Sequence, residues 1–133
     1  MALVGTNRGV NSNGTAATSI TIVPGTNFTA GSFAVLAVAY DNAGGGGSDP
    51  YVSITDTAGN VWTSRANALN DPAAASAGSV LRIFTSTVTT LTTGTTITIS
   101  LNASTTAKAW SLTEFTSDNI NGRPEFVTSA VAT

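Results

Sequence analysis

The feature of this chain that most constrains its fold is an alternation of polar and apolar residues with a period of two. It is clearest in residues 95–101, where Ile97, Ile99 and Leu101 fall on one side of an extended strand and hydroxyl residues fall on the other. No segment shows the 3.6-residue period of an amphipathic helix. Further strands are expected at residues 19–23, 33–40, 51–55, 61–65, 80–87, 108–115 and 126–131.

Seven or eight short strands at turn spacings of about 8–15 residues predict an all-β, antiparallel two-sheet β-sandwich. Residues 33–40 are apolar on both faces, so we expect a central strand there. The segment Asp56-Thr57-Ala58-Gly59-Asn60 predicts a short hairpin between the strands at 51–55 and 61–65, with Gly59 at a positive φ. Periodicity alone does not separate a jelly roll from an immunoglobulin-like topology.

The two ends of the chain are polar and short of charge, which favours a three-part organisation. We expect residues 1–15 to form an extended N-terminal arm, residues 16–116 the β-sandwich domain, and residues 117–133 a C-terminal tail or edge strand. The arm is a candidate for attachment to neighbouring subunits by strand addition. Its candidate contact residues are Leu3, Val4, Thr6, Asn7 and Arg8.

The amino-acid composition excludes several kinds of functional site. The chain lacks Cys and His, which excludes disulfides, thiolate metal sites, His-ligated metals and a nucleophile activated by His. Charged residues are 9% of the chain, against about 25% in a typical soluble domain. The net charge of −2 and five basic residues provide no basic footprint for nucleic acid. A neutral hydroxyl and amide surface suits an assembled state better than a free monomer.

The acidic residues do not show the spacing of a catalytic site. A glycosidase needs two carboxylates facing each other across a cleft, and nothing pairs them here. Asp41, Asn42, Asp49 and Asp56 are a candidate Ca²⁺ cluster, but the ordered calcium-loop motif is missing, and turn formation is the favoured interpretation. We expect no catalytic residues, no metal and no cofactor.

Two further features have a functional and a structural interpretation. The loop of Gly44, Gly45, Gly46 and Gly47 lacks the ending of a phosphate loop, and we interpret it as a candidate partner-contact loop. The aromatic residues are candidates for a sugar-stacking platform, but core packing is the favoured role. These residues are Tyr40, Tyr51, Trp62 and Trp110.

The order of segments resembles a β-sandwich domain of bacteriophage virion proteins and large bacterial surface proteins. The resemblance covers residues 31–116: the apolar strand 31–40, the hairpin motif T-D-x-A-G-N-x-[WY] at 55–62, the strands at 80–84 and 95–99, and the closing strand at 109–115, which begins with Ala109 and ends in Glu114-Phe115. These motifs are structural, so the resemblance implies a jelly-roll-like sandwich and no catalytic residues.

The resemblance and the low charge together predict a non-enzymatic virion structural protein, most specifically a capsid decoration (cement) protein. Its expected partners are the major capsid protein and copies of itself, with a homotrimer as the expected form, and neither nucleic acid nor membrane. The N-terminus has no secretory signal pattern, so we expect synthesis in the host cytoplasm and release within the virion. The alternatives are a carbohydrate-binding or adhesin module, and a head or tail fibre component.

Overall fold

The computed structural model describes residues 3–41, 49–70 and 78–117 of the chain. They form eight antiparallel strands in two sheets, as the alternating sequence predicts. No helix in these ranges is long and apolar enough to cross a membrane. The strands are β1 (Leu3–Asn13), β2 (Ala17–Ile22), β3 (Phe33–Asp41), β4 (Tyr51–Asp56), β5 (Thr63–Asn70), β6 (Ser79–Thr87), β7 (Ile97–Thr105) and β8 (Lys108–Ser117).

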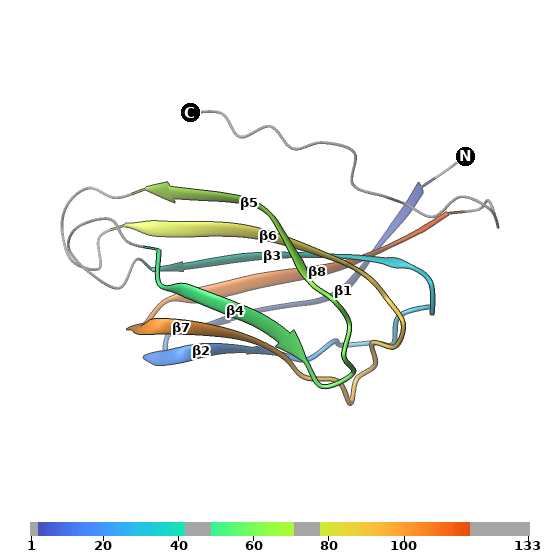
Figure 1. Cartoon of the computed structure of the whole chain (residues 1–133), viewed down its shortest axis with the longest axis horizontal. Helices are drawn as coiled ribbons and strands as arrows, with labels where there is room; N and C mark the ends of the chain where they lie inside the picture. Colours follow the sequence, from blue (N-terminus) through green and yellow to red (C-terminus); the bar gives the residue numbers. More distant parts are fainter. Residues whose placement is uncertain (1–2, 42–48, 71–77, 118–133) are drawn as a thin grey trace.

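The two sheets lie face to face (Figure 1). One has five strands in the order β1-β8-β3-β6-β5, and the other has three in the order β2-β7-β4. The pairs β1·β8, β2·β7 and β3·β6 are nested, as in a chain that wraps into a jelly roll. The expected antiparallel two-sheet β-sandwich is therefore confirmed. The pair that would complete the nesting, β4·β5, is replaced by pairing of β5 with β6.

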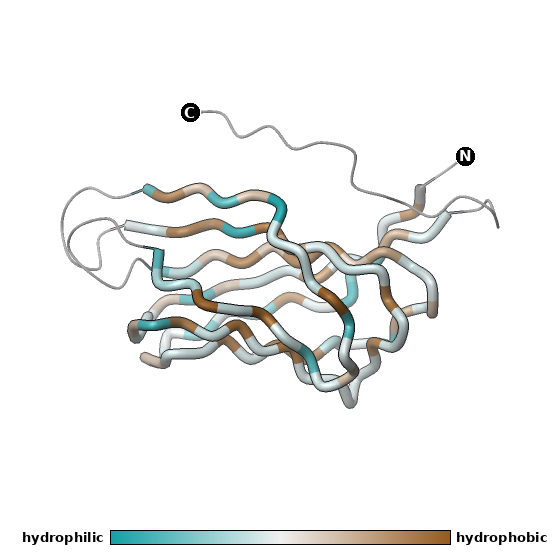
Figure 2. The backbone as a smooth tube through the Cα atoms, in the orientation of Figure 1, coloured by the Kyte–Doolittle hydropathy of each residue, from teal (hydrophilic) through white to brown (hydrophobic). Residues whose placement is uncertain are grey.

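The core lies between the sheets and follows the period of two. Along β3 every second side chain is buried, and Leu36 and Val38 are fully enclosed. They meet Ile97 and Ile99 of β7 in one core cluster, to which β6 contributes Phe84. The same alternation of apolar and polar positions is visible along the strands in Figure 2.

The expected central position of residues 33–40 is also confirmed. β3 pairs with β8 on one side and with β6 on the other, so its backbone is bonded along both edges. Its second face points away from the other sheet. There Val35, Ala37 and Ala39 remain partly exposed.

The hairpin predicted around Asp56 is wrong. β4 belongs to the three-stranded sheet and β5 to the five-stranded sheet, so the segment between them carries the chain from one sheet to the other. Gly59 does have a positive φ, 78°, as expected. The turn chemistry was therefore predicted correctly, whereas the pairing of the strands it joins was not.

The N-terminal boundary is also corrected. Residues 3–13 do not extend outside the sandwich, because β1 pairs along its length with β8 and forms an edge of the five-stranded sheet. The expected tail at 118–133, the strand expected at 126–131, the loop Gly44–Gly47 and Asn42 lie outside the described residues.

Candidate functional site

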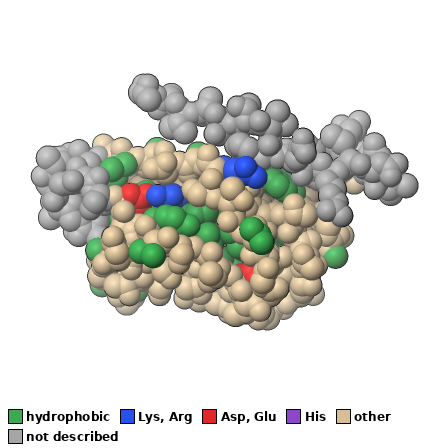
Figure 3. All heavy atoms as spheres, in the orientation of Figure 1, with side chains coloured by type: hydrophobic (Ala, Val, Ile, Leu, Met, Phe, Trp, Pro, Cys, Tyr) green, Lys and Arg blue, Asp and Glu red, His purple; other side chains and the backbone are tan. Residues whose placement is uncertain are grey.

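Every charged side chain in the described ranges forms hydrogen bonds within the protein. The acidic groups accept them from backbone amides, tyrosine, tryptophan or arginine, and the basic groups donate them to carboxylates, hydroxyls or carbonyls. On the face shown in Figure 3, charged side chains are few among apolar and neutral polar ones. The charged residues concerned are Arg8, Asp41, Asp49, Asp56, Arg65, Arg82, Lys108 and Glu114.

The most buried of these groups is the Glu114 carboxylate on β8. Its side chain is 1% exposed. Oε2 accepts hydrogen bonds from Nε and Nη2 of Arg8, and Oε1 accepts one from the Thr29 amide at 2.6 Å. Arg8 reaches inward because a bulge in β1 shifts the register between Asn7 and Gly9. The pair thus fastens β1 and the loop after β2 to β8.

Arg8 is therefore not free to act as an attachment residue. Its guanidinium also donates to the Thr26 hydroxyl at 3.1 Å, and its backbone oxygen accepts a hydrogen bond from Gly25 N. The other expected arm residues lie along β1. The side chains of Val4, Thr6 and Asn7 are exposed, and the Leu3 backbone pairs with Ser117.

A second cluster joins β3, β4 and β6 around Asp49. Its Oδ1 accepts hydrogen bonds from the Tyr40 hydroxyl at 2.7 Å and the Tyr51 amide at 3.0 Å, and its Oδ2 accepts one from Arg82 Nε at 2.7 Å. The Arg82 guanidinium lies over the Tyr51 ring, 4.1 Å from its centroid. Sequence reasoning gave Arg82 no role. Its position between the apolar Leu81 and Ile83 is the signal that it needs an internal partner.

The environments of Glu114 and Asp49 both lower the pKa of the carboxylate. Burial alone would raise the pKa of Glu114, but hydrogen bonds from the Thr29 amide and Arg8 outweigh it and hold this pKa below its ordinary value. Burial likewise opposes the lowering at Asp49, and hydrogen bonds from Arg82 and Tyr40 again prevail, so its pKa is lowered. Burial and the neighbouring Asp49 raise the pKa of Tyr40.

These shifts predict how thermal stability depends on pH. The folded pKa values of Glu114 and Asp49 lie below their ordinary values of 4.5 and 3.8, so the unfolded chain binds protons more readily. Their contribution to stability is complete above about pH 5 and is lost as the pH falls through the folded pKa values. With no His or Cys, no side chain titrates at its ordinary pKa between about pH 5 and 8.

We therefore expect a melting temperature that is constant from about pH 5 to 8 and falls steeply below about pH 4. Melting followed by circular dichroism across this range measures it. A step in stability near neutral pH, or unchanged stability at pH 3, would contradict the assigned roles of the two carboxylates.

The third cluster is the corner between β4 and β5. Oδ1 of Asp56 accepts hydrogen bonds from the amides of Ala58 and Asn60, at 2.9 and 3.0 Å. Oδ2 accepts from the Asn60 side chain at 2.9 Å and from Nε1 of Trp62 at 2.7 Å. The Asn60 amide oxygen in turn accepts from Thr89 N at 2.8 Å. The polar groups of Asp56, Asn60 and Trp62 thus all have partners within the protein.

The acidic residues considered for Ca²⁺ have separate partners. The Asp41 carboxylate accepts a hydrogen bond from Ala107 N at 2.8 Å. Asp49 accepts one from Arg82, and Asp56 accepts one from Trp62 at the corner between β4 and β5. Within the described ranges, no group of three acidic residues comes together in a geometry suited to a metal ion.

The aromatic residues pack against the core. Tyr40 is buried, and Tyr51, Trp62 and Trp110 are partly buried against the core cluster. The ring centroids of Tyr51 and Phe84 are 5.4 Å apart. This packing against the core is the role favoured by the sequence, and it leaves Tyr51, Trp62 and Trp110 only partly exposed.

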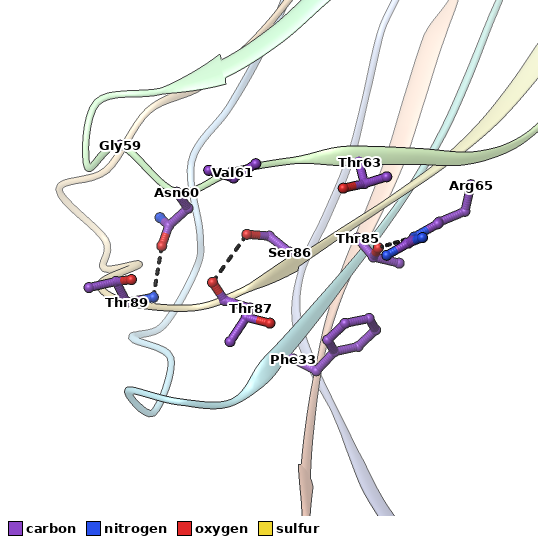
Figure 4. Close-up of a pocket in the computed structure, with 10 residues that line it drawn as sticks. All are labelled: Phe33, Gly59, Asn60, Val61, Thr63, Arg65, Thr85, Ser86, Thr87 and Thr89. Carbon is purple, nitrogen blue, oxygen red and sulfur yellow. Dashed lines mark hydrogen bonds between the residues drawn. The ribbon is translucent and has the colours of Figure 1, made fainter. Parts of the chain in front are cut away.

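A shallow groove of about 350 Å³ lies beside the β4–β5 corner (Figure 4). Its walls carry hydroxyl groups from β5 and β6, the Asn60 amide and the Arg65 guanidinium. Arg65 Nε donates to the Thr85 hydroxyl at 2.8 Å, and Thr89 N donates to Asn60. The residues that line this groove include no carboxylate, so they hold no general base that could activate a hydroxyl.

Comparison of the chain with protein-family models, curated proteins and solved structures gives no match.

Proposed function

We propose that this chain is a non-enzymatic structural protein of a bacteriophage virion that decorates the capsid and stabilises the shell. The observation that carries the proposal is the pairing of the described charged side chains with other groups of the same protein. Every described charged group is held by partners within the protein, so it is not directed at a substrate. The segment order that resembles virion β-sandwich domains supports the same class.

A decoration protein must bind many equivalent positions on a shell. Neutral hydroxyl, amide and small apolar groups suit such contacts, because repeated copies bring like surfaces close together and like charges would repel. The partners proposed are the major capsid protein and other copies of this chain. Synthesis in the host cytoplasm and release within the particle complete the proposal.

The structure changes the proposed attachment. A free arm is replaced by β1, an edge strand whose early residues carry exposed side chains. Val4 is 53% exposed near the start of this strand. We propose that this end of β1 contacts the shell through Val4 and its neighbours, with the backbone edge available for strand addition.

Replacing Val4 by Asp tests this contact. A carboxylate buried in a neutral interface lacks a partner, so we expect capsid affinity to fall about tenfold or more. Co-sedimentation of the purified protein with capsids that lack it measures the effect. Deleting residues 1–15 would be uninformative, because it removes a strand of the five-stranded sheet.

The matched control is Val52→Asp, since Val52 is 57% exposed on β4 of the opposite sheet. We expect this variant to sediment with capsids like the unmodified protein. Equal loss in both variants, or none in Val4→Asp, would contradict attachment through β1. Absence of sedimentation by the unmodified protein would contradict the decoration role itself.

A further inference from the structure

The outer face of the five-stranded sheet has an unusual composition for a surface exposed to water. In most antiparallel sheets with one buried face, the outward side chains are polar. Residues paired directly across strands share a face, so the strand register identifies the outward set. One outward row crosses all five strands and contains Val10, Ser111, Ala37, Ile83 and Ala66.

The neighbouring row has the same character. It includes Ala109 of β8, Ala39 of β3 and Leu81 of β6. Val10 is 63% exposed and Leu81 is 45% exposed. In these two rows the side chains on the central strands β8 and β3 are small, and larger apolar ones lie on β1 and β6. Further along the same face, the row at Val35 carries Thr113 and Thr85, and the row at Phe33 carries Phe115.

Among residues 3–41, 49–70 and 78–117, the charged side chains of this face lie toward its rim. Arg65 lies on the edge strand β5, where its Nε donates to Thr85. Asp41 lies at the end of β3, where its carboxylate accepts a hydrogen bond from Ala107 N. An apolar centre with a polar rim is the anatomy of a protein–protein interface.

We infer that this face packs against the same face of a second copy of the chain. A two-fold interface brings each patch against itself, so a charged centre would repel its own copy, whereas this neutral one does not. The small residues at the centre let two sheets approach to the usual distance of about 10 Å.

The size of the face agrees with this occupant. Five strands spaced about 4.8 Å apart, taken over the seven residues 33–39 of about 3.3 Å each and including the hydroxyl-bearing row at Val35, give a face of about 550 Å² per copy. The two copies together bury about 1,100 Å², above the roughly 1,000 Å² expected of a specific interface. The segment 118–133 of the same chain is a poorer occupant, because it contains Asp118, Arg123 and Glu125, which would lose water on an apolar face.

The dimer gives the proposed structural role a defined self-contact, and its biological meaning rests on that role. A two-fold contact differs from the homotrimer expected from the sequence. In a decoration protein, it would link neighbouring copies on the shell through their outer faces.

Sedimentation equilibrium of the full chain over a wide concentration range tests the inference. We expect a monomer–dimer equilibrium, and we expect Ala37→Arg to raise the dissociation constant about 30-fold or more, because it places a bulky charged side chain without a partner in the interface. Ala109→Arg, on the exposed outer side of β8, is the second variant if the first does not fold. Val52→Arg, on the opposite sheet, is the control and should dimerise like the unmodified chain.

A full chain that is monomeric at every concentration would overturn the inference, as would equal dimerisation of Ala37→Arg or equal weakening by Val52→Arg. If deletion of 118–133 turned a monomer into a dimer, the segment itself would be the occupant, and the inference would again fail. Capsid sedimentation is measured separately. A monomer that binds capsids refutes the dimer alone, and a dimer that never binds them refutes the decoration role alone.

Discussion

Replacing Glu114 by Ala is expected to lower the free energy of unfolding by about 3 kcal/mol and the melting temperature by about 10 °C. The variant removes the acceptor of the Thr29 amide and of two Arg8 donors. The cost should lie at the lower end for a buried pair, because Arg8 is 20% exposed and can recover part of its hydration. Urea denaturation followed by circular dichroism measures the loss.

A paired variant separates the ion pair from the space that it fills. Replacing Arg8 and Glu114 together by Met removes both charges and keeps comparable side-chain volume, so we expect much of the lost stability to return. Glu114→Gln should be intermediate, since its amide group accepts at one position only. Additive losses in the double Met variant would contradict the assignment of Glu114 and Arg8 as one coupled unit.

Replacing Asp56 by Ala is expected to cost about 2–3 kcal/mol, because four donors lose their acceptor. The corner that takes the chain from one sheet to the other would keep the hydrogen bonds of Asn60 to Thr89 and Thr90 and those between Thr57 and Thr96. Asp56→Asn separates the contribution of the backbone donors from that of the side-chain donors. Its oxygen can still accept from the Ala58 and Asn60 amides, whereas its NH₂ group faces the side-chain donors of Asn60 and Trp62.

We expect Asp56→Asn to lose about half as much stability as Asp56→Ala and to change tryptophan emission as Trp62 loses its partner. Denaturant melts and fluorescence spectra of the two variants measure these effects. Stability equal to that of the unmodified protein in Asp56→Ala would show that the turn does not depend on this carboxylate.

The strands were predictable because their signal is local. The alternation at Ile97, Ile99 and Leu101 identifies the buried face of β7 without knowledge of its neighbours. The same is true of Gly59, whose turn needs a positive φ whichever sheets it joins. The positions of Lys108 and Glu114 on the inward face of β8 also follow from alternation.

The strand pairing was not predictable in the same way, because it depends on contacts distant in sequence. The Asp56 motif suits either a hairpin or a corner, and the choice depends on whether β5 pairs with β4 or with β6. The sequence of the N-terminal segment predicted a polar arm, because β1 is an edge strand whose side chains are largely exposed. The Arg8–Glu114 bond links residues 106 positions apart, and the pairing of β1 with β8 is similarly distant in sequence.

Residues 33–40 are apolar on both faces of the strand, and this pattern indicates more than a central position in the sheet. Sequence reasoning explained it by a central position in the sheet, which the structure confirms. A central position accounts for pairing along both edges of β3, but not for an apolar outer face. The partly exposed Val35, Ala37 and Ala39 are therefore among the residues from which we infer a dimer face.

The central claim is that this chain is a structural subunit of a virion. The proposal requires that a phage encodes the chain, and quantitative mass spectrometry of that phage's purified particles, with the major capsid protein as internal reference, tests the claim most directly. We predict that the chain is present at a copy number of the same order as the major capsid protein. A few copies per particle would assign it to a fibre or tail, and its absence from the particle would contradict the account.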